Sequence, residues 1–248
     1  MAGKGTYRTT AIVLDKTKLG EKDLILTLVA SSGRALRAVA KGARKPGSRL
    51  AARCELFCEV DLLLARGRNL DVVSQAELVA APLGARASYE ELCAASAVAE
   101  VACRCCYEEA DDPFVYAVTR AALATLPGLD EAHLALVCAA YVFKLLSHEG
   151  YRPDLEGCVL CGDEAPGFFS ASAGGLVCAS CAATVAGATP LAPGEGAWLR
   201  ALIGMRFNEL AGTPVDLACA IRLLGFSHTW ASTHLEARFR SLETMCGR

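Results

Sequence analysis

Two alternating runs decide how the first eighty residues are interpreted: CELFCEVDLLL at 54–64 and LDVVSQAEL at 70–78. In each run, apolar residues alternate with mostly polar ones at a period of two, which is typical of a β-strand with one buried face. The intervening ARGR at 65–68 contains a glycine and is typical of a hairpin turn. The two runs therefore predict a β-hairpin.

Three more β-prone runs precede this hairpin, at 9–15, 24–30 and 34–41. Five short strands in so short a segment cannot lie flat with one apolar face exposed, so closure into a small barrel is the natural solution. Residues 1–80 are therefore expected to form a small β-barrel.

Beyond residue 80 the apolar period changes from two to about 3.6, which is typical of helices. Ser88-Tyr89-Glu90-Glu91 and Asp112-Pro113 are capping sequences that predict two helix starts. A third predicted helix ends at Gly150, and its apolar stripe consists of Leu134, Val137, Cys138, Tyr141 and Leu145. The second part of the chain is therefore expected to be a helical domain, 81–156 and 185–248, interrupted by an insert at 157–184.

The insert contains two C-x-x-C pairs separated by sixteen residues, Cys158/Cys161 and Cys178/Cys181. This spacing is that of a four-thiolate zinc site, in which each pair directs two sulfur atoms at one point. The segment has few large apolar residues, so metal binding would supply much of its folding free energy. We expect one structural zinc ion, because four thiolates leave no open position for a substrate or water.

The same four cysteines have two other interpretations. They are either unrelated core residues or two redox-active dithiols, in which case the protein is a thiol oxidoreductase. The chain has 13 cysteines. No secretory signal is visible, so a cytoplasmic location and reduced thiols are expected. Metal analysis separates the zinc site from the redox pair.

Charge is distributed unevenly along the chain. Residues 1–80 have a net charge of +6 and residues 81–248 a net charge of −8. Within the first part, a basic stretch of twenty residues contains seven cations and no acid: Arg34, Arg37, Lys41, Arg44, Lys45, Arg49 and Arg53. A barrel with a basic strand and the basic loop 41–49 is a plausible track for a nucleic-acid backbone, although a solvated surface loop is the alternative.

Aromatic residues are scarce in the expected barrel, which contains only Tyr7 and Phe57. Phe57 lies on the mainly acidic face of its predicted strand. Base stacking, the usual second contribution to single-strand binding, is therefore poorly provided for. Phosphate contacts should dominate, with little sequence preference and strong salt dependence.

Several classes of protein are excluded by the composition. With 53% hydrophobic residues and a net charge of −2 the chain is not disordered. The longest uncharged apolar run, 134–143, has ten residues and is too short to span a membrane. No phosphate-binding G-x-x-x-x-G-K-[ST] loop for an ATPase is present. The dense acidic run at 108–112, which a nuclease would need, is better explained as a solvated connection between helices.

The order of these parts resembles the RecO family of bacterial recombination mediators. The likeness runs from about residue 7 to the C-terminus. It is carried by YRTTAIVL at 7–14, the basic KGAR at 41–44, GYRPDL at 150–155, and the two cysteine pairs with their flanking glycines.

The resemblance implies an α+β multidomain fold: an N-terminal OB-fold barrel, then a helical domain with an inserted four-cysteine zinc finger. It also implies a non-enzymatic role in DNA repair. That role is to bind single- and double-stranded DNA, to anneal complementary strands and, with RecR, to load RecA onto strands coated by single-strand binding protein. A zinc-ribbon scaffold that does not bind nucleic acid is a further alternative, and it would leave the basic stretch without a role.

Overall fold

The computed structural model describes residues 5–247, and the chain forms two compact units. The first contains the residues up to Ser88 together with Ala99–Pro127. The second contains Tyr89–Val98 together with the residues from Gly128 onward. Helix α2 (Tyr89–Cys105) contributes its first part to the second unit and its last part to the first.

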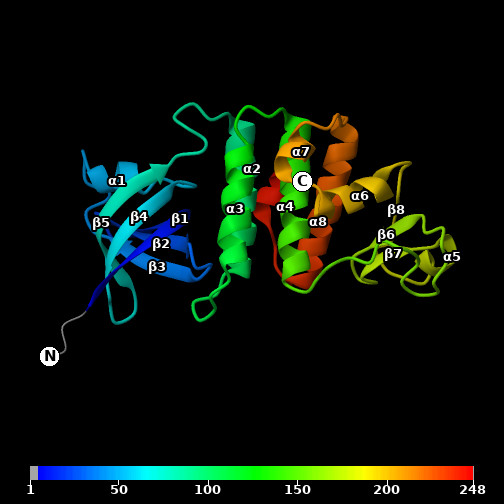
Figure 1. Cartoon of the computed structure of the whole chain (residues 1–248), viewed down its shortest axis with the longest axis horizontal. Helices are drawn as coiled ribbons and strands as arrows, with labels where there is room; N and C mark the ends of the chain where they lie inside the picture. Colours follow the sequence, from blue (N-terminus) through cyan, green and yellow to red (C-terminus); the bar gives the residue numbers. More distant parts are fainter. Residues whose placement is uncertain (1–4, 248) are drawn as a thin grey trace. The chain divides into compact units, whose positions relative to one another are not determined.

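The first unit contains a closed barrel of five strands in the order β1-β2-β3-β5-β4 (Figure 1). All neighbouring strands are antiparallel except β3 and β5, which pair in parallel over two residue pairs. A short helix precedes β4. This order and helix position are those of an OB-type barrel, so the predicted barrel is confirmed. The elements are β1 (Thr6–Leu19), β2 (Asp23–Ala30), β3 (Ala35–Ala40), α1 (Arg49–Arg53), β4 (Glu59–Ala65) and β5 (Asp71–Ala80).

The barrel is filled by the apolar faces of its strands. Leu26 and Leu28 of β2 and Leu62 and Leu64 of β4 are almost fully buried, which is the alternation that the sequence predicts. Burial of one such leucine stabilises the fold by about 2 kcal/mol. The hydrophobic core of the barrel therefore comes from residues two positions apart in each strand.

The start of the run 54–64 was wrongly predicted as strand. Residues 54–58 lie between α1 and β4, and Phe57 is buried with a φ of 68°, so it is not on an exposed acidic face. The backbone N–H of Phe57 donates to the carbonyl of Val13 at 2.8 Å, and the N–H of Val13 donates to the carbonyl of Cys58 at 3.0 Å. These two bonds hold the turn that brings the Phe57 ring inside.

Helix α3 (Pro113–Thr125) packs against the barrel strands β1 and β2. Asp112 caps it, as predicted, by accepting a hydrogen bond from the N–H of Phe114. The buried carboxylate of Glu59 accepts hydrogen bonds from the hydroxyl of Tyr116 and, at 2.8 Å, from Arg120. These contacts are consistent with the place of α3 in the first compact unit.

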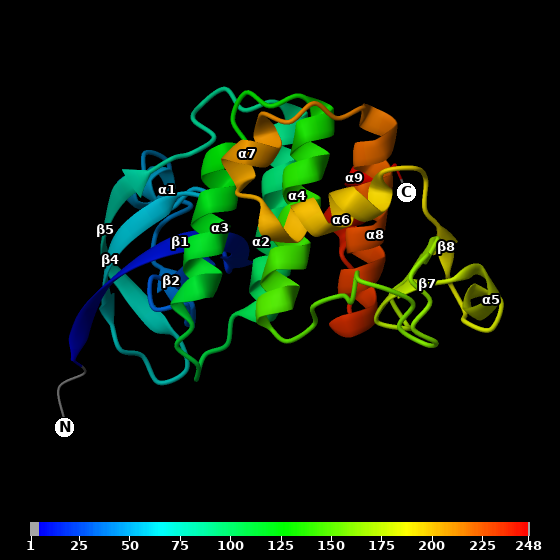
Figure 2. The ribbon, with the colours of Figure 1, turned by 45° about the vertical axis from the view of Figure 1, so that its right-hand side comes forward.

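The second unit is built around α4 (Glu131–His148), which is buried along most of its length. The predicted apolar stripe of this helix is buried in full. Helices α4 and α8 lie side by side in Figures 1 and 2. Within residues 5–247, no helix is long and apolar enough to cross a membrane. The remaining helices of this unit are α6 (Glu195–Gly204), α7 (Phe207–Ala211), α8 (Leu217–His234) and α9 (Arg240–Met245).

Residues 151–190, which contain the predicted insert 157–184, are called the finger here and are more ordered than the loop that the sequence suggests. The three strands of the finger form a small sheet in the order β7-β6-β8. Gly175 has a φ of 159°, and a side chain there would collide with the carbonyl of Asp154 at 2.1 Å. The finger elements are β6 (Phe168–Ser170), β7 (Gly175–Val177), α5 (Ala179–Ala182) and β8 (Thr189–Pro190).

Candidate nucleic-acid interface and metal site

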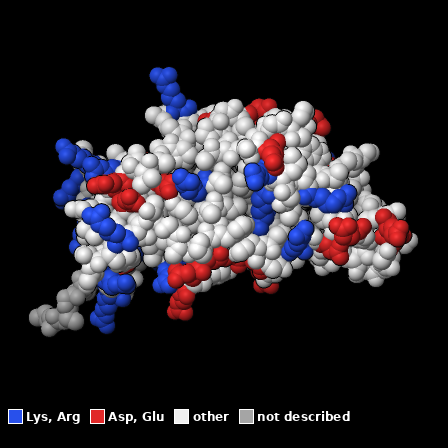
Figure 3. Space-filling model, viewed as in Figure 1, with Lys and Arg blue, Asp and Glu red and all other residues white. Residues whose placement is uncertain are grey.

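Four of the seven predicted cations are exposed and make no ion pair with any residue between 5 and 247: Arg37, Lys41, Lys45 and Arg49. In the view of Figure 3, Lys and Arg side chains predominate over the barrel unit. Unpaired guanidinium and ammonium groups keep all their donors available, so these side chains are suited to contact phosphates.

The other three predicted cations are engaged within the first unit. Arg34 forms an ion pair with Asp111, from its Nε to a carboxylate oxygen at 3.1 Å. Arg44 donates to the carbonyl of Gly20 at 2.8 Å, and Arg53 donates to that of Ala76 at 2.9 Å. The contacts of Arg44 and Arg53 hold the barrel's backbone, whereas that of Arg34 is to a side-chain carboxylate; all three occupy part of the donor capacity of the arginine.

Of the predicted loop 41–49, residues 41–48 lie in turns between β3 and α1, and only Arg49 belongs to a helix. Strand β3 ends at Ala40, a turn follows, and Arg49 begins helix α1. The side chain of Ser48 caps that helix by accepting from the N–H of Ala51 at 3.4 Å. Lys41 therefore lies outside the strand that carries Arg37.

A polar groove of about 400 Å³ on the barrel unit collects arginines from three parts of the chain. Arg34 and Arg37 come from the basic stretch, whereas Arg8 and Arg66 were missed by the sequence analysis. Strand β1 pairs with β4 so that Thr6 lies opposite Ala65, which brings the hairpin residue Arg66 beside the start of β1. The proximity of Arg8 and Arg66 follows from the register of β1 with β4, which are far apart in the sequence.

Tyr7 is the aromatic residue of this groove. Its hydroxyl donates to the carboxylate of Asp71 at 2.5 Å, and the guanidinium of Arg66 lies 4.7 Å from the ring centre. Burial, followed by the contact with Asp71, raises the pKa of Tyr7 to about 12. Because Arg66 covers the ring, Tyr7 offers little surface for base stacking, in line with the expected dominance of phosphate contacts.

A second depression lies at the β1–β2 hairpin and is lined by three lysines and two acids: Lys22, Lys41, Lys45, Glu21 and Asp23. The N–H of Gly42 donates to the carboxylate of Asp23 at 2.7 Å and fixes the turn that carries two of these lysines. Two separate depressions therefore hold part of the barrel's cations, the first with four arginines and the second with three lysines.

In the finger, the structure brings together the four cysteines of the predicted metal site. The sulfur atoms of Cys158, Cys161, Cys178 and Cys181 all lie within 4.8 Å of one another, and those of Cys161 and Cys178 are 3.7 Å apart. A tetrahedron with zinc–sulfur bonds of about 2.3 Å places its sulfur atoms about 3.8 Å apart. The four cysteines can therefore hold a metal ion.

Hydrogen bonds within the cysteine cluster shift the pKa values of its thiols in opposite directions. Backbone N–H groups, first that of Cys178, lower the pKa of Cys158 to about 6. The neighbouring thiols, first that of Cys161, raise the pKa of Cys181 to about 12. Four thiolates so close together repel one another, so a divalent cation among them would relieve this repulsion.

Cysteines outside the finger behave as packing residues. Burial raises the pKa of Cys54 to about 11 and those of Cys103 and Cys138 to about 12. A thiol with a raised pKa is a poor nucleophile and a poor metal ligand at neutral pH.

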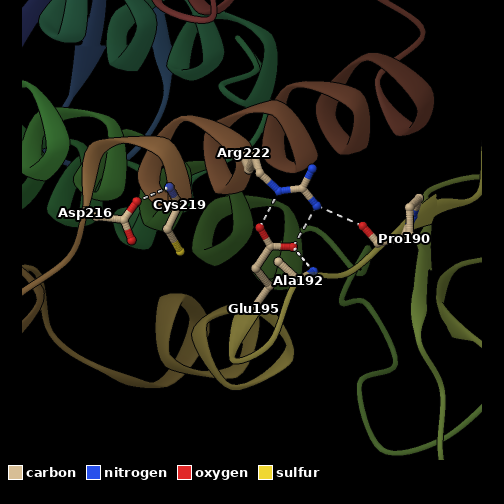
Figure 4. Close-up of polar contacts among 6 residues, drawn as sticks. All are labelled: Pro190, Ala192, Glu195, Asp216, Cys219 and Arg222. Carbon is tan, nitrogen blue, oxygen red and sulfur yellow. Dashed lines mark hydrogen bonds and ion pairs between the residues drawn. The ribbon is translucent and has the colours of Figure 1, made fainter.

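Three side chains of the helices hold the two ends of the finger by its backbone. At the start of the finger, Trp230 donates to the carbonyl of Tyr151 at 3.0 Å, and Arg200 donates to that of Leu155 at 2.9 Å. At its end, Arg222 donates to the carbonyl of Pro190 at 2.8 Å (Figure 4). The finger is thus fixed to α6 and α8.

Arg222 also forms an ion pair with the buried carboxylate of Glu195 (Figure 4). Burial raises the pKa of Glu195, but hydrogen bonds from Arg222 and from the N–H of Ala192 outweigh it and hold this pKa below 4.5. One guanidinium therefore joins α8 to α6 and to the last strand of the finger.

Fold and site together define a protein with an OB-type barrel that carries exposed cations and a helical unit that carries a four-cysteine finger. Two family models cover nearly the whole chain: "Recombination protein O N terminal" over residues 1–82 and "Recombination protein O C terminal" over residues 86–243.

Curated relatives agree with these models. The chain is 36% identical over 241 residues to the DNA repair protein RecO of Bifidobacterium longum (strain DJO10A), covering 95% of this chain and 97% of the relative. It is 34% identical over 240 residues to the DNA repair protein RecO of Roseiflexus sp. (strain RS-1), covering 95% and 81%. The chain therefore belongs to the RecO family of DNA repair proteins.

Proposed function

We propose that this protein is a non-enzymatic recombination mediator that binds single- and double-stranded DNA through the barrel and anneals complementary strands. One observation carries the proposal: on the barrel of a RecO-family chain, Arg37, Lys41 and Lys45, which are exposed and make no ion pair within residues 5–247, line two depressions together with further cations. A cationic surface screens two polyanions from each other, so it promotes strand pairing without nucleotide hydrolysis.

The DNA contacts that we propose are those of the predicted set, with two additions. Arg37, Lys41, Lys45 and Arg49 supply exposed charge, and Arg8 and Arg66 extend it across the groove. Arg34, Arg44 and Arg53 also remain in the set, but each already makes a contact within the barrel unit.

Zinc is the metal that we propose for the finger. Four thiolates in a tetrahedral arrangement are typical of structural zinc sites, and the buried cluster beside these thiols is small, with Cys158, Val177 and Cys178 as its buried members. We retain the barrel at 1–80, the helical domain at 81–156 and 185–248, and the zinc-finger insert at 157–184 as the proposed domains.

Family membership also supports a set of protein partners: RecR, single-strand binding protein and, indirectly, RecA. In this proposal the protein acts with RecR to load RecA onto strands coated by single-strand binding protein, and it is associated with the nucleoid in the cytoplasm.

An annealing assay with complementary strands, first bare and then coated by single-strand binding protein, tests the proposed function. We expect faster pairing with the protein than without it on both substrates, and no need for a nucleotide. If the protein neither binds oligonucleotides at low ionic strength nor speeds their pairing, the proposal is wrong. Reactive, metal-free thiols would favour a thiol oxidoreductase instead.

A further inference from the structure

The segment between α2 and α3 is strongly acidic and lies against the arginine-lined groove. This acidic connection, Tyr107–Asp112, contains four carboxylates and no cation. The two oxygens of Asp111 accept hydrogen bonds from Nε and Nη2 of Arg34, both at 3.1 Å. The guanidinium of Arg34 thus holds a carboxylate with the paired geometry in which arginine also binds a phosphate.

Two backbone contacts fix the acidic connection in this position. The N–H of Ala35 donates to the carbonyl of Tyr107 at 3.0 Å. Gly33 has a φ of +84°, and a side chain on it would lie 1.7 Å from the carbonyl oxygen of Asp112. The close approach therefore requires glycine, so the fold itself, and not only two exposed side chains, seats the connection here.

Within the groove, Glu108 and Asp111 of the acidic connection face the same space as Arg8, Arg37 and Arg66. We propose that the Asp111 side chain of the acidic connection is an autoinhibitory latch. Its carboxylate occupies the place of a DNA phosphate at Arg34 and must swing away when a strand enters the groove, while the backbone of the connection stays in place. This inference rests on the proposed function and adds a regulation of the same site.

The ion pair between Arg34 and Asp111 is weak enough for a DNA strand to displace it. The side chains of Arg34 and Asp111 are 42% and 57% exposed, so their ion pair is of the weak, solvent-screened kind. A strand that brings several phosphates to the groove gains more from counterion release than this pair contributes. The latch therefore lowers the affinity of the groove for a single phosphate or a short oligonucleotide more than its affinity for a long DNA strand.

The test compares charge-matched variants in oligonucleotide titrations at low salt, followed by fluorescence anisotropy. Asp111→Asn removes the latch charge, and Glu109→Gln removes an equal charge from an exposed residue that does not line the groove. We expect Asp111→Asn to bind single-stranded DNA about three- to fivefold more tightly than the unsubstituted protein. Glu109→Gln is expected to stay within about twofold of it.

Arg34→Gln completes the test in combination with Asp111→Asn. The latch predicts that the gain from Asp111→Asn disappears when Arg34 is also replaced. An equal gain in Glu109→Gln, or a gain that persists without Arg34, would overturn the latch, since mere loss of negative charge would then explain it. Glu108→Gln, a second variant within the groove, should show a smaller gain. If neither the unsubstituted protein nor Asp111→Asn binds DNA, the proposed function itself fails.

Discussion

The carboxylate of Glu195 accepts hydrogen bonds from Nε and Nη2 of Arg222 at 2.5 and 2.9 Å, with only 2% of the Glu195 side chain exposed. Arg222 itself is 43% exposed and is therefore the solvated half of the pair. A buried carboxylate that loses its partner is left uncompensated, so the contribution of this pair is best seen by removing the arginine.

Arg222→Gln should lower the free energy of unfolding by about 3 kcal/mol, because it leaves the Glu195 carboxylate buried with the N–H of Ala192 as its remaining donor. Urea denaturation followed by circular dichroism measures the change. Arg238→Gln is the matched control, since Arg238 is 71% exposed in its pair with Glu243 and its replacement should change the free energy of unfolding far less. Equal effects of the two variants would contradict this account.

Glu195 also predicts how stability depends on pH. Its pKa in the folded protein is held below the ordinary value of 4.5, so its contribution is complete above that value and is lost as the pH falls through the folded pKa. Glu195→Gln should therefore be less stable near neutral pH but lose less stability between about pH 6 and about pH 3. Denaturation curves at several pH values test this. If the free energy of unfolding falls with pH by the same amount in Glu195→Gln and in the unsubstituted protein, Glu195 does not contribute to acid unfolding.

Removal of groove arginines should weaken DNA binding and its salt dependence together. For Arg37→Gln and Arg66→Gln, each lost phosphate contact should reduce the slope of log affinity against log salt by about 0.7 for single strands. Both effects should be independent of base sequence, because phosphates carry no sequence information. Arg152→Gln, an exposed arginine of the second unit, is the charge-matched control and should leave the slope unchanged. An unaltered slope in the groove variants would move the binding surface elsewhere.

The finger should bind one zinc ion per chain and unfold without it. Cys161→Ser and Cys181→Ser should each release the metal and lower the melting temperature, since the buried cluster beside the thiols is small and half of the metal ligands belong to it. Elemental analysis and thermal melts with and without a chelator measure both effects. Cys219→Ser, a partly exposed thiol outside the cluster, should retain the metal. A metal-free protein with reactive thiols would refute the zinc site.

The barrel and the finger were accessible to prediction because each depends on a local pattern. The alternation at 54–64 and 70–78 marks the hairpin of β4 and β5, and the spacing of the two C-x-x-C pairs marks the metal cluster. Asp112 similarly marks the start of α3, since a helix cap is set by adjacent residues.

Features that depend on long-range contacts were not predictable in this way. The alternation places Glu59 on the solvent-facing side of its strand, yet it is buried because Tyr116, 57 residues further along, donates to it. Arg8 and Arg66 join Arg37 in one groove only through the register of β1 with β4. Phe57 is buried through a left-handed backbone conformation that no alternation pattern encodes.

The three side-chain bonds at the ends of the finger have a mechanical consequence. Trp230, Arg200 and Arg222 clamp the backbone on both sides of the cysteine cluster. These bonds are expected to make the finger move together with the helices as one rigid part. A force that a binding partner applies to the finger is therefore expected to be transmitted to α6 and α8.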